Sequence, residues 1–170
     1  MNELQQLIET LKSPEYLHVL LNPLPVYATA MGVLALVIAL LMRSRQAQAV
    51  ALIVVFVGCA SAWPVVHYGL RGYDRIYSMS YEDAQKWLDV HRDRAEDFQY
   101  LFYITAVLAV IALIANWKFP KKAVLLSTIT LVSAVMCVAV GGWIGHAGGQ
   151  VRHSEFRQGP PPQIEHVYKH

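Results

Sequence analysis

Histidines are the residues of this sequence best suited to metal or haem chemistry, and they gather near the ends of hydrophobic segments. Neutral imidazole is the commonest protein ligand of transition metals, and it also binds haem iron. His67 ends the second long apolar stretch and His146 ends the fourth, so this pair is the first candidate for a bis-histidine haem site. We expect His18, His91 and His153 near the same membrane face, as candidate metal ligands.

A second group of residues could close the same end of the protein as a polar cap. Two glycines allow the last apolar helix to break or turn at the surface. The following "RHSE" could then fold back over the end of the bundle, with its arginine paired to an acid before the third apolar stretch. The acids could orient histidine ligands, or the whole set could be a hydrogen-bond network without a cofactor. The residues assigned to the cap are Asp93, Asp97, Gly148, Gly149, Arg152 and Glu155.

Several other kinds of chemistry have no support in the sequence. No H-E-x-x-H, C-x-x-C-H, phosphate-binding loop or nucleophile elbow is present, so no enzyme class is indicated. Cys59 and Cys137 both lie inside apolar segments, as buried small side chains do. No basic stripe with interleaved aromatics exists, which argues against nucleic-acid binding. The apolar segments contain no Asp, Glu, Lys or Arg in their interiors, which disfavours a channel or pump.

The elements that must position the histidines are membrane helices. Hydrophobic residues make up 55% of the 170 residues and charged residues only 15%, which is too apolar for an ordinary soluble domain. Four apolar stretches, at about 24–42, 49–68, 98–117 and 123–146, reach the roughly 20 residues that a spanning helix needs. Short links favour antiparallel neighbours, so we expect an all-α, up-down four-helix transmembrane bundle over residues 23–147.

The charges predict which way the bundle faces. Both short links carry only positive charge, with Arg43 and Arg45 in the first and Lys118, Lys121 and Lys122 in the second. The positive-inside rule places these links in the cytoplasm and both termini outside. Every acidic residue and every histidine then lies on the outer side or at its boundary.

The outer segments are expected to differ in structure. Residues 1–22 contain "ELQQLIETL", which predicts a short amphipathic helix on the outer membrane surface. Residues 80–97 should form a helix that runs directly into the third span. Residues 148–170 include three consecutive prolines and should be an extended tail. Gly141 and Gly145 are expected to let the last helix pack closely on a neighbour or on another protein. The two helical hairpins show no shared motif.

Three motifs, "LHVLLNPLPVY", "HRDRAE" and "GGQVRHSE", together resemble a family of small four-helix bacterial membrane proteins of unknown function. The family pattern is H-x-x-L-N-H-x-P, H-E-x-x-A and G-G-x-I-R-H-T-E-I. Related membrane domains are fused to cytochrome c modules, so the resemblance implies an electron-transfer setting. Pro23 stands where the family has a histidine and Arg92 where it has a glutamate, which implies the loss of part of any family metal site. The matching positions are His18, Asn22, Pro25, His91, Ala95, Gly148, Gly149, Arg152, His153 and Glu155.

Two functions of different classes follow from these observations. The first is a non-enzymatic subunit of a larger bacterial electron-transfer, respiratory or photosynthetic complex, which stabilises or docks partners at the outer face. The alternative is a small membrane redox protein that binds haem b or a transition metal through the outer histidines. The expected partners are the lipid bilayer and other membrane subunits. The expected location is the bacterial inner membrane, with both termini on the periplasmic side.

Overall fold

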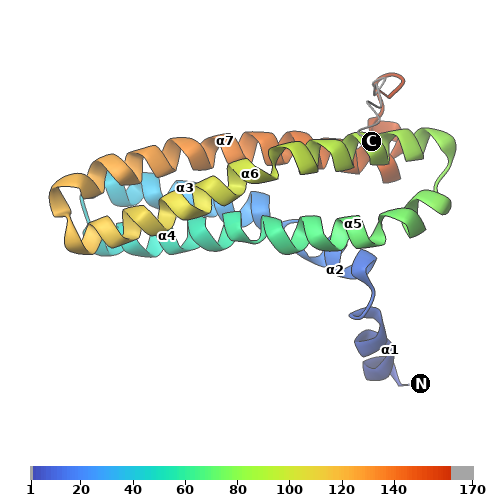
Figure 1. The fold of residues 1–170 in the computed structure, drawn as a ribbon, viewed down its shortest axis with the longest axis horizontal. Helices are drawn as coiled ribbons and strands as arrows, with labels where there is room; N and C mark the ends of the chain where they lie inside the picture. Colours follow the sequence, from blue (N-terminus) through green and yellow to red (C-terminus); the bar gives the residue numbers. More distant parts are fainter. Residues whose placement is uncertain (1, 162–170) are drawn as a thin grey trace, which may run out of the picture.

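The computed structural model describes residues 2–161 and is helical throughout its length (Figure 1). The elements are α1 (Glu3–Thr10), α2 (Pro14–Leu21), α3 (Leu24–Leu41), α4 (Arg45–Ala60), α5 (Ala62–Ser78), α6 (Glu82–Lys118), α7 (Pro120–Arg152) and the short 3-10 helix η1 (Ser154–Phe156). The described part of the chain contains no strand.

Four lengths of helix are long and apolar enough to cross a membrane. They are Pro14–Leu41, Arg45–Ser78, Glu82–Lys118 and Pro120–Arg152. They pack as a ring in which α3 contacts α4 and α7, while α6 contacts α4 and α7. The expected four-helix bundle of antiparallel neighbours is therefore present.

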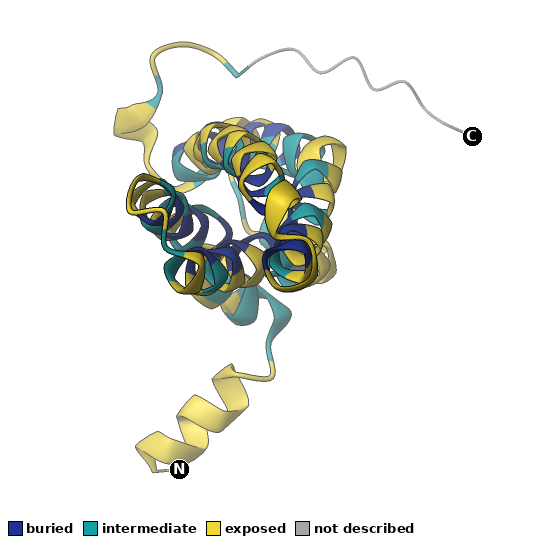
Figure 2. Cartoon of the chain, turned by 90° about the vertical axis from the view of Figure 1, so that its left-hand side faces the viewer, coloured by how far each residue is buried: buried dark blue, intermediate teal, exposed yellow. Residues whose placement is uncertain are grey.

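The side chains on the inside and outside of this ring are those of a membrane bundle. The core is built mainly from small residues, including Ala39, Ala51 and Ala112. Large apolar side chains such as Leu41 (79% exposed) and Trp117 (78% exposed) lie on the outer surface of the helices. Figure 2 shows the exposed residues on the outside of the bundle and the buried ones toward its inside. In water such a surface would be unfavourable, whereas lipid tails would cover it, and the small core residues let helices approach closely.

The ends of the bundle are chemically different. At one end, two tight links join α3 to α4 and α6 to α7, and we call this the basic end. Arg43 adopts a left-handed conformation (φ 51°) that closes α3, and the Ser44 hydroxyl then caps α4 by accepting from the Ala47 N–H. Pro120 begins α7 at a position where a helix needs no N–H donor. The opposite end, formed by α2, α5, the start of α6 and the end of α7, is the histidine end (Figure 1).

The elements at the histidine end differ from the expected ones in three places. The amphipathic helix exists as α1, but a second helix, α2, follows it and packs on α5. The second span is divided at Ser61 into α4 and α5, and α5 continues ten residues past the expected end at 68. The expected helix break at Gly148 and Gly149 is wrong, because α7 continues to Arg152. Of the expected extended tail, residues 162–170 lie outside the described part of the chain.

Candidate functional site: a histidine-lined cavity

A cavity of about 970 Å³ opens at the histidine end between α2, α5, α6 and α7. Here α2 packs on α5, and α2 and α7 are not among the closely packed helix pairs, which leaves the ring of helices open. The lining surface of the cavity is mostly apolar, and the polar side chains along it include histidines, arginines and acids. This size and composition are typical of sites for small organic ligands or cofactors. We call it the histidine cavity.

His18 enters the cavity from α2 and is held by the backbone of α5. Its Nδ1 lies 2.8 Å from the carbonyl oxygen of Val65. A carbonyl can only accept, so Nδ1 must carry the proton and donate it, which leaves Nε2 with a free lone pair. The ring lies directly against Gly69, where a Cβ atom would come within 2.8 Å of Nδ1. A glycine at this position therefore makes room for the imidazole.

His91 enters from α6 and is held in the same way by α7. Its Nδ1 lies 2.9 Å from the carbonyl oxygen of Ile144, so this ring also donates from Nδ1 and keeps a lone pair on Nε2. A Cβ atom on Gly148 would come within 3.0 Å of the ring.

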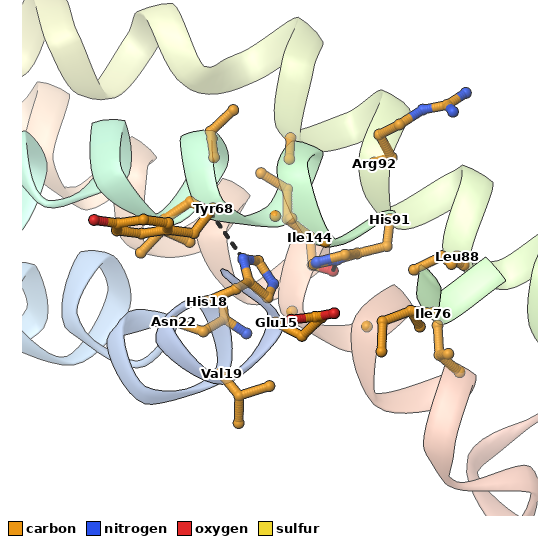
Figure 3. Close-up of a pocket in the computed structure, with 18 of the residues that line it drawn as sticks. Glu15, His18, Val19, Asn22, Tyr68, Ile76, Leu88, His91, Arg92 and Ile144 are labelled. Carbon is orange, nitrogen blue, oxygen red and sulfur yellow. Dashed lines mark hydrogen bonds between the residues drawn. The ribbon is translucent and has the colours of Figure 1, made fainter. Parts of the chain in front are cut away.

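The two imidazoles meet inside the cavity. Their ring centroids are 6.1 Å apart and their planes are inclined by 74°. Figure 3 shows His18 and His91 pointing into the same space from α2 and α6. Two imidazoles that are each fixed through Nδ1 by a backbone carbonyl could both offer Nε2 to one metal centre.

Glu15 is a further polar group of this cavity. It lies one helical turn before His18 on α2, and α2 can approach α5 closely there because Gly72 has no side chain. One Glu15 oxygen accepts from Arg75 at 3.1 Å, while Oε2 is buried and has no hydrogen-bond partner in the described part of the chain. An unpaired buried carboxylate oxygen is costly, so a ligand that donates to it would be favoured.

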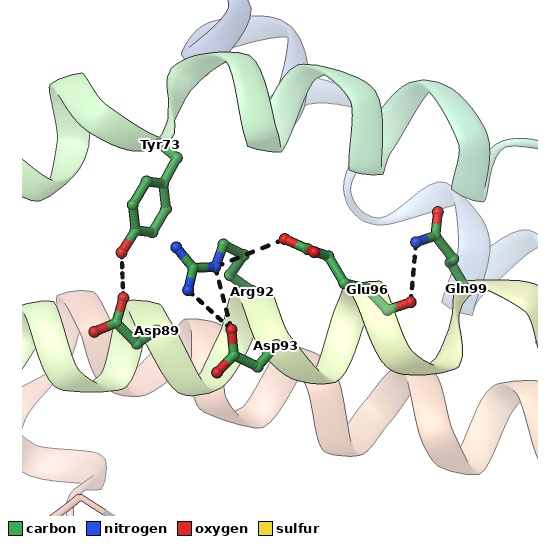
Figure 4. A network of polar contacts seen from close by, with 6 residues as sticks. All are labelled: Tyr73, Asp89, Arg92, Asp93, Glu96 and Gln99. Atoms are coloured by element: carbon green, nitrogen blue, oxygen red, sulfur yellow. Dashed lines mark hydrogen bonds and ion pairs between the residues drawn. The ribbon is translucent and has the colours of Figure 1, made fainter. Parts of the chain in front are cut away.

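A polar network joins α5 to α6 beside the cavity (Figure 4). The Tyr73 hydroxyl donates to the buried carboxylate of Asp89. The Arg92 guanidinium lies 4.4 Å from the centre of the Tyr73 ring and also bonds to Asp93 and Glu96. Burial and the hydrogen bond to Asp89 raise the pKa of Tyr73, so the phenol stays a donor at neutral pH.

The structure does not bring His67 and His146, the sequence-predicted haem pair, together. The His67 ring is exposed and stacks on Trp63, with 5.3 Å between ring centres. His146 is exposed on α7, with its Nε2 3.3 Å from Gln150. Neither side chain lines the histidine cavity, and no contact between them is present.

The predicted three-histidine metal set and the predicted cap are also arranged differently. His153 lies beyond α7 and also lines the cavity, but it stacks on Phe156 and contacts Glu155 at 2.9 Å, so its ring does not join the contact between His18 and His91. Within residues 2–161, no three His, Cys, Asp or Glu side chains are grouped so that they could hold a metal ion. Arg152 is exposed at the cavity rim and forms no ion pair with Asp93 or Asp97 among the described contacts.

The glycines that the sequence analysis selected have different surroundings in the structure. Gly141 packs against Val26 and Phe102, whereas Gly145 has no neighbouring atom where its Cβ would be. Gly148 accommodates a histidine ring, and Gly149 lies near Phe156. The segment after α7 turns back on α7 itself, because Gln150 donates to the Phe156 carbonyl and Arg157 to the Gln150 carbonyl.

Sequence reasoning missed Glu15, Gly69 and Gly72 as residues of the site. Glu15 and His18 are three positions apart and so share a helix face, but recognising this required the helix α2, which was not expected. No family model, curated protein or solved structure matches the chain. The family resemblance described from the sequence therefore stays a prediction.

Proposed function

We propose that this protein is a small membrane electron-transfer protein that binds haem b in the histidine cavity, where His18 and His91 would hold the haem iron. The observation that carries the proposal is the pair of imidazoles 6.1 Å apart, each fixed through Nδ1 to a backbone carbonyl and each with Nε2 free. Such an arrangement orients both rings before a ligand arrives.

The number of protein donors favours haem over a bare metal ion. A zinc site takes three or four protein ligands, and no such group exists among residues 2–161. A porphyrin supplies its own four nitrogens, so the protein needs to provide only one donor on each face. When bound, a haem iron with both axial positions filled carries single electrons.

The rest of the cavity is compatible with an amphiphilic, anionic cofactor. Apolar walls suit the flat hydrocarbon surface of a porphyrin. Arg152 lies at the cavity rim with no ion pair among the described contacts, whereas Arg75 and Arg92 already pair with Glu15 and Glu96, which also line the cavity. The Arg152 guanidinium could pair with a carboxylate such as a haem propionate. His18 and His91 would hold the iron, the carbonyls of Val65 and Ile144 would keep both rings in the required tautomer, and the helices would exclude water.

The proposal includes an orientation and a setting. The purely cationic links at the basic end support a cytoplasmic location for that end, which puts the cavity and both termini on the periplasmic side of a bacterial inner membrane. We include membership of a larger electron-transfer complex, with docking at the outer face. Helix α1 supports this part, because Leu4, Leu7 and Ile8 are exposed on a helix that points away from the bundle (Figure 2).

The test is an absorption spectrum of the full-length protein, purified in mild detergent, before and after reduction by dithionite. We expect a Soret band and sharp reduced α and β bands. His18→Ala and His91→Ala should each lower the haem content at least tenfold, whereas His67→Ala and His146→Ala, the matched controls, should keep it. Absence of haem from the wild-type protein, or its retention in both ligand variants, would exclude the proposal.

A rescue experiment separates loss of a ligand from loss of folding. His91→Gly leaves a space for an external imidazole next to Gly148. Added imidazole should restore the low-spin spectrum of His91→Gly and should have no effect on His67→Gly. Failure of rescue in a variant that elutes as a monodisperse species would count against His91 as a ligand.

A further inference from the structure

We propose that the two helical hairpins, residues 14–78 and 82–152, are repeats of one unit, and that each unit holds one imidazole of the central pair with the same backbone module. Gly69 and Gly148 are then equivalent positioning residues for the ligand site. This inference rests on the proposed function for the identity of the ligand, but the repeat and the modules have their own evidence.

The module is the same in both hairpins. A histidine donates from Nδ1 to the carbonyl of an aliphatic residue, Val65 or Ile144, on the second helix of its own hairpin. The residue one helical turn later is a glycine, and it lies directly against the histidine ring. The sequences at these places are "VVHYG" and "IGHAG", which share the pattern aliphatic-x-His-x-Gly.

A second matched pair of contacts lies deeper in the bundle. The Thr29 hydroxyl is 3.6 Å from the Cys59 sulfur in the first hairpin, and the Thr105 hydroxyl is 3.2 Å from the Cys137 sulfur in the second. All four residues are fully buried. From the histidines to the glycines, each second-hairpin residue follows its counterpart by about 73 to 79 positions, so the matches keep their order along the chain.

Both hairpins start at the histidine end and return to it, so a two-fold axis along the bundle would superpose them. The contacts between hairpins agree with this axis, since α4 packs on α6 as α7 packs on α3. Parallel repeats related by an axis along the membrane normal are a known way to build membrane proteins. Residues that face the axis converge, as His18 and His91 do. Residues at matching outward positions diverge, as His67 and His146 do.

The glycines carry a specific prediction because the rings leave no room for a methyl group. A Cβ on Gly69 would lie 2.8 Å from the His18 ring, and a Cβ on Gly148 would lie 3.0 Å from the His91 ring. Each substitution should displace only the ring in its own hairpin. Gly142 and Gly145, on the same helix as Gly148, have nothing within 4 Å of their Cβ positions and are matched controls.

The experiment is nitrogen NMR of the full-length protein in detergent, labelled with ¹⁵N-histidine, as purified and in a diamagnetic state. Single histidine substitutions assign the signals. We expect His18 and His91 both to carry the proton on Nδ1. Gly69→Ala should shift the His18 signals and Gly148→Ala the His91 signals, whereas Gly142→Ala and Gly145→Ala should shift neither. A proton on Nε2 of either ring, or loss of this hairpin-by-hairpin selectivity, would overturn the inference.

This readout works with or without haem, so the two proposals can fail separately. Protein without haem but with both Nδ1–H tautomers and selective glycine effects would remove the proposed function and leave the repeat. A protein that binds haem but lacks the Nδ1–H tautomers or the selective glycine effects would support the proposed function and overturn the repeat. In a haem-binding protein, Gly69→Ala and Gly148→Ala should also alter the reduced spectrum.

Discussion

At the scale of single residues, direction on a helix matters more than depth in the membrane. His67 and His146 were expected at a similar depth, but His67 is two positions from Val65 and Gly69, the α5 residues that contact His18. Two positions correspond to a rotation of about 200° around a helix. The His67 side chain therefore points away from the face of α5 on which Val65 and Gly69 contact His18. The sequence could place these histidines along the membrane normal but could not tell which of them face inward.

The Tyr73–Asp89 hydrogen bond should contribute measurably to stability, because Asp89 is buried and loses its donor when the hydroxyl is removed. Tyr73→Phe should lower the free energy of unfolding by about 1–3 kcal/mol, the cost of an unpaired buried polar group. Tyr77→Phe is the control, because no hydrogen bond of its hydroxyl is present among the described contacts. The measurement is denaturant unfolding in detergent. If both substitutions lowered the free energy of unfolding equally, the Tyr73–Asp89 hydrogen bond would not be a specific source of stability.

At the scale of helices, the sequence predicted most of what the structure contains. The four apolar stretches, the amphipathic α1 and the continuous helix from the outer segment into the third span all followed from hydrophobic length and pattern. Helix α2 was missed because residues 1–22 were expected to contain only one short amphipathic helix before the first span. Pro14 and Pro25 occupy the first turns of α2 and α3. The N–H groups of a first turn make no hydrogen bond within the helix, so a proline there costs none.

Close helix packing in the first hairpin depends on Gly58. A Cβ on this glycine would lie 2.6 Å from the backbone nitrogen and the hydroxyl of Thr29 on α3, so α3 and α4 would have to separate. Gly58→Ala should therefore destabilise the protein by about 1–3 kcal/mol, the usual cost of overpacking. Gly142→Ala, with open space at its Cβ, should change the thermal midpoint little. A stable Gly58→Ala variant would contradict the close approach of α3 to α4.

At the scale of the whole molecule, the proposed orientation can be tested with single cysteines. Cys59 and Cys137 are fully buried and should stay unreactive, so they provide an internal background. A membrane-impermeant maleimide applied to intact spheroplasts should label Ser154→Cys at the histidine end. It should label Lys121→Cys at the basic end only after lysis. The reverse pattern would place the histidine cavity in the cytoplasm.

The bundle could be predicted from the sequence, but its internal repeat could not. The shared pattern is five residues long, and the matched histidines are contributed by α2 in one half and by the continuous α6 in the other. Only the carbonyl contacts of Val65 and Ile144 reveal that His18 and His91 are equivalent. Such contacts join positions far apart in the sequence, and hydrophobic pattern carries no information about them.

The location of these two carbonyls also constrains the order of events during synthesis. Residue 18 leaves the ribosome early, yet its anchor lies at the end of the second span, and the anchor for residue 91 lies near the end of the fourth. Neither ring is fixed until its hairpin has been inserted in the membrane, and the pair is complete only after the last span is in place. Cofactor capture would therefore be a late step in biogenesis. A nascent chain that stalls before Ile144 would leave the His91 ring without its carbonyl anchor. Cofactor binding would therefore occur only in chains whose synthesis has passed Ile144.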